Sequence, residues 1–227
     1  MAARVCSTRK EGAVRRARLA ILYVIVLLGL SGCFDAGPSD PICGLILYEE
    51  SFDGSGPGWP QSVDDESKTS IQDGRYRIEV LDVSSYIYVR NEEQGPYADL
   101  CYSARVWDQS DGKAQSAGLM FRCTDAGEFY VFSIHPDSHT VSFAIFSGDR
   151  ARPIRATSSD AVRGVGEENH VRVIAEGNRF RFFVNDELVL EEFDDRLSTG
   201  GIGVSGASWE TLPTVLTFDD LVVRRLK

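Results

Sequence analysis

The sequence lacks the features of several large protein classes. Its longest apolar run, Leu19–Leu30, has 12 residues, fewer than the roughly 18 that a membrane-spanning helix needs. Positive charge is in the minority, with 24 Lys and Arg against 34 Asp and Glu and a net charge of -10, which argues against general nucleic-acid binding. No internal repeat is present, which excludes a propeller. The 227 residues, 43% of them hydrophobic, instead suit a folded protein with one all-β domain or two small ones.

Residues 1–32 have the pattern of an export signal. Six Lys and Arg residues and one acid, Glu11, precede the apolar run Leu19–Leu30. A charged segment followed by a short apolar run is typical of a signal peptide. A buried core helix is the alternative, but such a helix needs a polar face, which this run does not have.

The signal ends in a motif that resembles the lipobox of bacterial lipoproteins. The motif is Leu30-Ser31-Gly32-Cys33, a branched apolar residue and two small residues before a cysteine. The resemblance implies cleavage before Cys33 and lipidation of its thiol, so that the membrane is a partner and the protein lies in the cell envelope, facing away from the cytoplasm. An ordinary signal peptide with an incidental cysteine is the alternative. Because the mature chain is acidic, we expect the lipid rather than charge to hold it at an anionic surface.

The mature chain is predicted to be a short tether, residues 33–44, followed by one all-β domain, residues 45–227. Short runs rich in Val, Ile, Phe, Tyr and Thr are separated by turn residues, a pattern typical of strands. The predicted strands are Leu45–Glu50, Arg75–Val80, Tyr86–Arg90, Leu100–Trp107, Ala117–Cys123, Phe129–His135, Thr140–Phe146, His170–Glu176, Arg179–Val184, Glu187–Glu192, Gly201–Ser205 and Leu216–Arg225. Asp73-Gly74 and Asn185-Asp186 supply the positive φ that tight hairpins need.

Alternation along these runs predicts the fold class. In 129–134, Phe129 and Val131 fall on one face and Tyr130, Phe132 and Ile134 on the other, so both faces are apolar. This suits the central strands of a two-sheet antiparallel β-sandwich, with one face in the core and the other covered or lining a cleft.

The order of motifs resembles the concanavalin A-like, laminin-G-like jelly-roll domains of exported bacterial proteins. The matching segments, in order, are 49–53 with Gly58-Trp59, 73–76, 117–122, 128–132, 169–173, 183–186, 200–203 and 218–221. They cover nearly the whole mature chain. The resemblance implies two stacked, curved antiparallel sheets, a fold that carries lectins, glycosidases, carbohydrate modules and spacers alike.

Three cysteines, Cys43, Cys101 and Cys123, remain after the signal and the lipobox are set aside. If the strands at 100–107 and 117–123 form a hairpin centred near Gly112, Cys101 and Cys123 face each other. We therefore predict a Cys101–Cys123 disulfide, with Cys43 free or paired in place of one of them. Buried free thiols are the alternative.

Two groups of residues could hold a metal ion, and no other cofactor is expected. Jelly-roll domains often hold a structural calcium ion between their first and last strands, so the resemblance suggests Glu50, Asp53 and Asp219 as its oxygen ligands. Solvated acids are the alternative. His135, Asp137 and His139 surround a predicted turn, but their spacing fits no common zinc arrangement.

The sequence favours a binding module over an enzyme. It contains no Glu-x-Asp-x-x-Glu string, which the glycosidases of this fold carry on one strand, and no Gly-x-Ser-x-Gly elbow. The segment 117–122 also resembles part of the 3-keto-disaccharide hydrolases, but Ser116 and Ala117 replace the Asn and Ser of that motif. These departures argue against transferring the activity.

Carbohydrate is the expected ligand, because aromatic faces and a few polar groups can converge on a concave sheet. The candidate ligand-binding residues are Trp209, Trp107, Arg122 and Tyr130. Trp209 is the strongest, since it follows a strand of small residues and lies in a predicted loop. Core packing is the alternative for each. A glycan-processing hydrolase and a non-catalytic structural envelope lipoprotein remain the alternative functions, with an envelope protein as partner in the latter.

Overall fold

The computed structural model describes residues 42–110, 115–148, 150–210 and 212–227. Their regular elements are all strands, so this part of the chain contains no helix that could cross a membrane. The predicted signal segment, Cys33 and residues 33–41 of the predicted tether lie outside the described residues. Cys43 and Gly44 of that tether belong to the first strand, which begins two residues before the predicted strand Leu45–Glu50.

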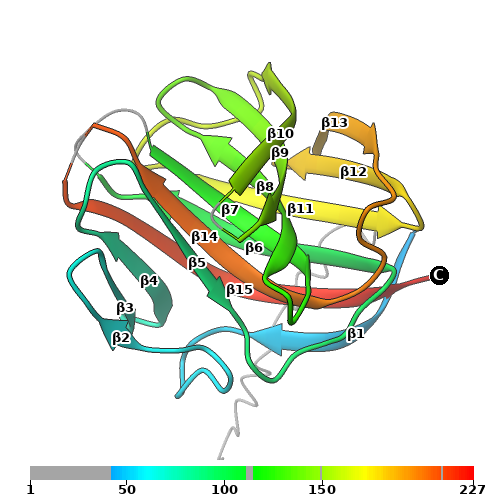
Figure 1. Cartoon of the computed structure of the whole chain (residues 1–227), viewed down its shortest axis with the longest axis horizontal. Coiled ribbons are helices and arrows are strands. Elements are labelled where there is room, and N and C mark those ends of the chain that lie inside the picture. The colour runs from blue at the N-terminus through cyan, green and yellow to red at the C-terminus, as the bar shows by residue number, and fades with distance from the viewer. Residues whose placement is uncertain (1–41, 111–114, 149, 211) are drawn as a thin grey trace, which may run out of the picture. The chain divides into compact units, whose positions relative to one another are not determined.

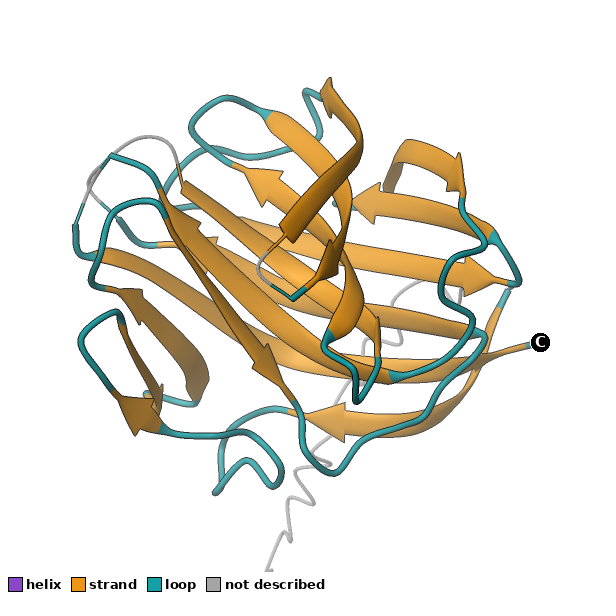
Figure 2. Ribbon diagram, in the orientation of Figure 1, coloured by secondary structure: helices purple, strands orange, loops and turns teal. Residues whose placement is uncertain are grey.

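Two antiparallel sheets form the sandwich (Figures 1 and 2). The nine-stranded sheet has the order β13-β12-β11-β6-β15-β4-β3-β2, with β1 paired to β15. Its strands are β1 (Cys43–Glu50), β2 (Ser62–Val63), β3 (Ser67–Gln72), β4 (Arg75–Val80), β6 (Leu100–Asp108), β11 (Glu168–Glu176), β12 (Arg179–Val184), β13 (Glu187–Phe193) and β15 (Thr214–Leu226). The six-stranded sheet has the order β10-β9-β8-β7-β14-β5. Its strands are β5 (Ser85–Arg90), β7 (Gln115–Cys123), β8 (Glu128–His135), β9 (Thr140–Ser147), β10 (Arg150–Ser158) and β14 (Gly201–Ser208).

The core lies between the facing sides of the two sheets. On β8, Tyr130, Phe132 and Ile134 point into it, while Phe129 and Val131 join a second apolar cluster on the outer side of the same sheet. Phe132 stacks on Phe182 of the opposite sheet at 4.5 Å between ring centroids. The predicted all-β sandwich is therefore confirmed, and the two apolar faces of β8 have the two predicted environments: the core and a covered outer side.

Most strands follow the predicted pattern, and three were missed. The ranges Arg75–Val80 and Arg179–Val184 agree with the structure at both ends. The hairpins at Asp73-Gly74 and Asn185-Asp186 have the expected positive φ values. The missed strands are β2, β3 and β10. These three contain many polar or charged residues and lie toward sheet edges, where burial does not require apolar alternation.

The predicted Cys101–Cys123 disulfide is wrong. Cys101 instead pairs with Cys43, with a Cα–Cα distance of 5.9 Å, and Cys123 is a buried free thiol. The prediction assumed that β6 and β7 form a hairpin, but β6 lies between β11 and β15 whereas β7 lies between β8 and β14 in the other sheet. Burial raises the pKa of the Cys123 thiol to about 12, so this thiol is chemically inert at neutral pH.

Candidate functional site

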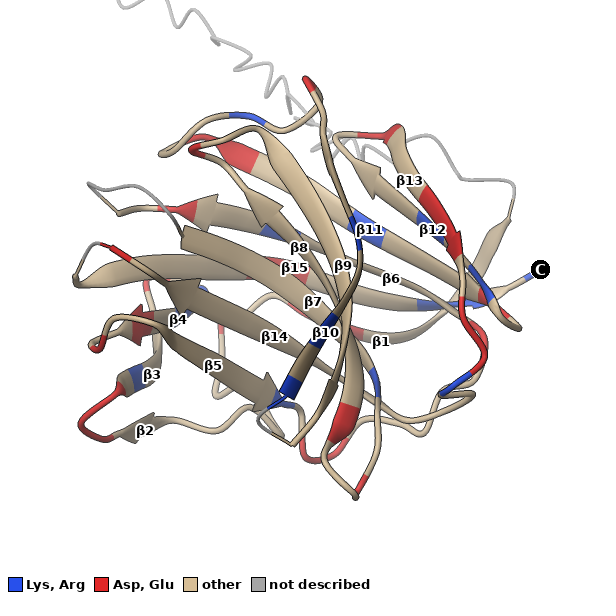
Figure 3. Cartoon of the chain, turned by 45° about the horizontal axis from the view of Figure 1, so that its top comes forward, with Lys and Arg blue, Asp and Glu red and all other residues tan. Residues whose placement is uncertain are grey.

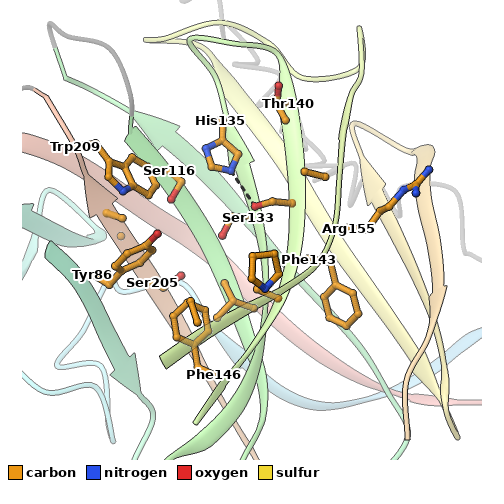
Figure 4. Close-up of a pocket in the computed structure, with 18 of the residues that line it drawn as sticks. Tyr86, Ser116, Ser133, His135, Thr140, Phe143, Phe146, Arg155, Ser205 and Trp209 are labelled. Carbon is orange, nitrogen blue, oxygen red and sulfur yellow. Dashed lines mark hydrogen bonds between the residues drawn. The ribbon is translucent and has the colours of Figure 1, made fainter. Parts of the chain in front are cut away.

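A groove of about 350 Å³ lies on the outer face of the six-stranded sheet. All six strands of this sheet, the turn between β8 and β9 and the loop after β14 supply the residues that line it (Figure 4). Among the described residues that line it, none is Asp, Glu or Lys, and Arg155 is the one with a permanent charge. The groove therefore offers mostly hydroxyl groups and aromatic rings to a ligand.

The floor of the groove is a row of small residues that runs across the strands. Tyr88 on β5 is the register partner of Ser205 on β14, which pairs with Gly118 on β7. Gly118 pairs in turn with Ser133 on β8, and Ser133 pairs with Ser142 on β9. Because partners in a sheet project to the same side, this register places three serine hydroxyls in one line across the outer face of the sheet.

Aromatic rings form one side of the groove. The rings of Trp209 and Tyr86 meet edge to face at 5.4 Å, and Tyr86 stacks on Tyr88 at 6.0 Å. Phe146 packs against both tyrosines, at 5.8 and 4.9 Å. Figure 4 shows Trp209 and Tyr86 on the side of the groove opposite Arg155. The flat, apolar faces of such rings suit the C–H surface of a sugar ring.

His135 adds a polar group beside Trp209. Its ring lies 6.0 Å from the Trp209 ring in a stacked arrangement, and its Nε2 is 2.9 Å from the hydroxyl of Ser142. Burial lowers the pKa of His135, although the carboxylate of Asp137 opposes that shift. The imidazole is therefore neutral at pH 7 and can donate or accept a hydrogen bond in the groove.

The stability of the domain should decrease as the pH falls below about 6.5, where the unfolded histidines begin to bind protons that the folded state excludes. The pKa values of both His135 and His170 are lowered, so both contribute in this direction. Replacing His135 with glutamine should make the dependence shallower between pH 7.5 and 5.5, measured by urea unfolding. An unchanged slope would contradict the assignment to His135.

Gly118 has no side chain, which leaves space in the floor of the groove for the neighbouring serine hydroxyls. A Cβ atom at this position would lie 2.6 Å from the Ser205 hydroxyl and 2.7 Å from the Ser133 hydroxyl. We therefore expect Gly118→Ala to displace both hydroxyls and to weaken ligand binding by about tenfold, at a stability cost of about 1–2 kcal/mol. Gly54→Ala is the matched control, because nothing lies within 4 Å of its Cβ position. Titration of both variants with the same glycan measures the difference, and equal affinities would contradict this role for Gly118.

Trp209 is the one predicted ligand-binding residue that the structure places in the groove. Trp107 lies on the nine-stranded sheet, only 8% exposed, with the Arg75 guanidinium 3.8 Å from its ring centroid. Tyr130 is fully buried between the sheets, where its hydroxyl donates to Asp194 and accepts from the Leu197 amide. Both rings are covered by the protein itself, so neither is available to a ligand in the groove.

Arg122 is a structural residue and not a groove residue. It is 1% exposed, and its guanidinium donates hydrogen bonds to the backbone carbonyls of Ala98, Gly177 and Leu197. Its φ of 51° coincides with a register shift between β7 and β14. This β-bulge turns the side chain toward the loops instead of the sheet face.

The three predicted calcium ligands are not brought together as a metal site. Glu50 accepts the Phe52 amide, Asp53 accepts the Ser51 hydroxyl and Asp219 accepts the Asp220 amide. Within 42–227, apart from the undescribed gaps, no three His, Cys, Asp or Glu side chains are placed to hold a metal ion. This also applies to the His135, Asp137 and His139 turn.

Sequence reasoning missed most of the groove. Tyr86, Tyr88, Phe146 and the serine row were not singled out, and His135 was considered only as a metal ligand. The alternation Tyr86-Ile87-Tyr88 is a signal for two outward rings, since Ile87 between them is a core residue. No local signal marks Ser133 or Ser205, because their role depends on the register between strands that are distant in sequence.

The family model described as the 3-keto-alpha-glucoside-1,2-lyase-like domain matches residues 48–223. The chain belongs to this family. The resemblance to 3-keto-disaccharide hydrolases is thus confirmed, and so is a glycan-related role at the level of the family. Among curated proteins, the levanase of Bacillus subtilis (strain 168) is 31% identical to this chain over 97 residues. That match spans 42% of this chain but only 14% of the levanase.

Solved structures with the same fold include a carbohydrate-binding module. The carbohydrate binding module CBM66 from Bacillus subtilis is 20% identical, with 79% of this chain and 96% of that chain covered and a TM-score of 0.51. The Bacillus licheniformis beta-glucanase is 10% identical, with 79% and 98% covered and a TM-score of 0.58. A Bacillus subtilis protein with a galectin-like fold is 13% identical, with 81% and 97% covered and a TM-score of 0.64. At these sequence identities, the structural similarity confirms the jelly-roll fold of this chain.

Proposed function

We propose that the protein is a lipid-anchored glycan-binding module that faces away from the cytoplasm. The observation that carries the proposal is the groove, where Trp209 and Tyr86 stand beside a floor of serine hydroxyls. Rings bury the C–H face of a sugar while hydroxyl groups and a neutral imidazole bond its polar edge. The export signal and the lipobox support the location, with Cys33 as the lipidated residue.

Replacing Trp209 with alanine should abolish most glycan binding while the fold is retained. Aromatic residues at the centre of a binding surface often contribute about 2 kcal/mol or more, which is about 30-fold in affinity. A glycan array with residues 38–227 would identify the ligand, and levan belongs in the panel because of the levanase match. Calorimetric titration would then compare the variants.

Phe193→Ala is the matched control, because this ring is also exposed but lies on β13 of the other sheet. The proposal fails if Trp209→Ala binds with wild-type affinity or if the control loses as much. It also fails if no glycan binds. Mass measurement of the protein purified from its own cells tests the anchor separately: retention of the first 32 residues or the absence of acyl mass on Cys33 contradicts it.

A lyase or hydrolase acting on glycans is the second candidate, and family membership favours it. Because no carboxylate is among the described lining residues, the groove does not support two-carboxylate hydrolysis. His135 is then the titratable side chain best placed to move a proton, by its contact with Ser142. Incubation with 3-keto-glucosides tests this candidate. Turnover that His135→Gln removes, without loss of binding, would favour the enzyme.

A further inference from the structure

The first strand leaves three consecutive large apolar side chains in solvent. Leu45, Ile46 and Leu47 are 75%, 46% and 41% exposed. They lie on β1, for which β15 is the one partner among the described strands, and the pairing shifts register on both sides of Ile46. An exposed apolar segment on a sheet edge favours association with another surface, so it is normally covered.

Basic residues lie directly beside this segment. Arg224, Arg225 and Lys227, at the end of the chain as given, line a shallow hollow with Cys43, Gly44 and Leu45. Within the described residues, no Asp or Glu lies within ion-pair distance of these three cations. In Figure 3, the blue of Lys and Arg is visible near the C-terminal end of the ribbon. Arg224 donates a hydrogen bond to the Gly44 carbonyl oxygen, so its charge has a neutral partner. In an acidic protein, an apolar strand flanked by cations that have no acidic partner in the described part of the chain is suited to an anionic, partly apolar surface.

The position of this surface fits a lipid bilayer. Cys43 follows Cys33 by ten residues in the sequence (43 − 33). A fully extended chain of ten residues is about 35 Å long, which is the largest possible separation of the two cysteines. A lipid on Cys33 would thus hold β1 within that distance of the bilayer, at high effective concentration. Cys43 itself is fixed by its disulfide to Cys101, against Ile174 and Phe183.

The groove lies on the opposite side of the sandwich from that disulfide. On β6, Tyr102 and Ala104 are core residues, so Cys101 projects from the outer face of the nine-stranded sheet. The groove is on the outer face of the six-stranded sheet. A bilayer at the first strand would therefore leave the groove open.

We propose that Leu45, Ile46, Leu47, Arg224, Arg225 and Lys227 form a docking surface for a bilayer that contains anionic lipids. The leucine and isoleucine side chains enter the headgroup layer and the cations bind lipid phosphates. This inference rests on the lipid-anchored part of the proposed function, and it is independent of glycan binding. Its consequence is a fixed orientation, with the docking surface toward the membrane and the groove exposed.

Flotation with vesicles tests the docking surface without the anchor. Residues 38–227 form one compact unit that contains every described strand and core residue, so this fragment suffices. We expect it to float with vesicles of phosphatidylglycerol and phosphatidylcholine at millimolar lipid, and at least threefold less with phosphatidylcholine alone. The variants Leu45→Ser with Leu47→Ser, and Arg224→Gln with Arg225→Gln, should each lower the bound fraction at least threefold.

The chain offers matched controls of both kinds. Val63→Ser with Phe193→Ser removes exposed apolar side chains elsewhere, and Arg150→Gln with Arg152→Gln removes exposed cations on β10. Full binding by both controls supports the proposal. Absence of preferential flotation with anionic vesicles, or equal losses in the controls, overturns it. A dimer in sedimentation that Leu45→Ser with Leu47→Ser dissociates, without vesicle binding, assigns the surface to a second copy and also overturns it.

Failures of this proposal and of the proposed function are distinguishable. Trp209→Ala should leave flotation unchanged, because Trp209 lies in the groove. The mass of the cell-derived protein reports lipidation of Cys33 independently of vesicle binding by the fragment.

Discussion

Replacing Arg122 with methionine will lower the free energy of unfolding by about 4 kcal/mol. Its guanidinium lies 2.6 Å from the Gly177 carbonyl oxygen, 2.7 Å from that of Leu197 and 3.0 Å from that of Ala98. These three loops are far apart in sequence, and the arginine joins them to β7. Methionine fills similar space but leaves the carbonyls without their donors, which is costly because the site is buried.

Urea unfolding measures this change, and two further variants make it interpretable. Arg150→Met alters an exposed arginine on β10 and should change the unfolding free energy by less than about 0.5 kcal/mol. Arg122→Lys keeps the charge, but one ammonium cannot bond all three carbonyls in the geometry of the planar fork, so an intermediate loss is expected. A loss below about 1 kcal/mol for Arg122→Met would show that the carbonyls find other partners.

Removing the Cys43–Cys101 disulfide will destabilise the domain by about 4 kcal/mol, as the chain-entropy relation gives for a loop of this length. The two residues are 58 apart in sequence. Without the bond, the unfolded chain has more conformational entropy, because the loop between the two cysteines is no longer closed. In the folded state, β1 loses its covalent link to β6. Since β1 is an edge strand, fraying should begin there.

The double variant Cys43→Ser with Cys101→Ser tests this by urea unfolding with and without dithiothreitol. The wild type in reductant should approach the double variant, and the double variant should not respond to reductant. A wild type that is equally stable in both conditions would contradict the prediction. A non-reduced digest should show a linked pair of peptides for Cys43 and Cys101 and a free thiol at Cys123.

The sequence predicts the strands wherever burial on one face requires apolar and polar residues to alternate. On β4 and β12 every second residue is buried, so alternation marked their limits. The strand β10 was not predicted, because it is an edge strand that contains arginines and a proline. Its residues are mostly exposed and need not alternate between apolar and polar. Local patterns report whether a residue is buried, but they do not report which sheet a strand joins.

That difference explains the errors at the cysteines and at the candidate site. The pairing of Cys101 was wrong because a short connection can cross between sheets as well as form a hairpin. Tyr130 and Arg122 were taken as surface groups because strands with two apolar faces give no sign of which face meets solvent. Trp209 was placed correctly, since its position after a strand of small residues indicated a ring outside the core.

The floor of the groove is built from every second residue of its strands, while the residues between them hold the sandwich together. In the proposed binding groove, substitutions at Ser116, Ser133, Ser142 and Ser205 would therefore change the contacts with a ligand without removing a residue of the apolar core. If the groove binds glycans as proposed, this division would let the ligand preference change while the scaffold is retained. It also makes these four positions a natural choice for a randomised library aimed at new specificities.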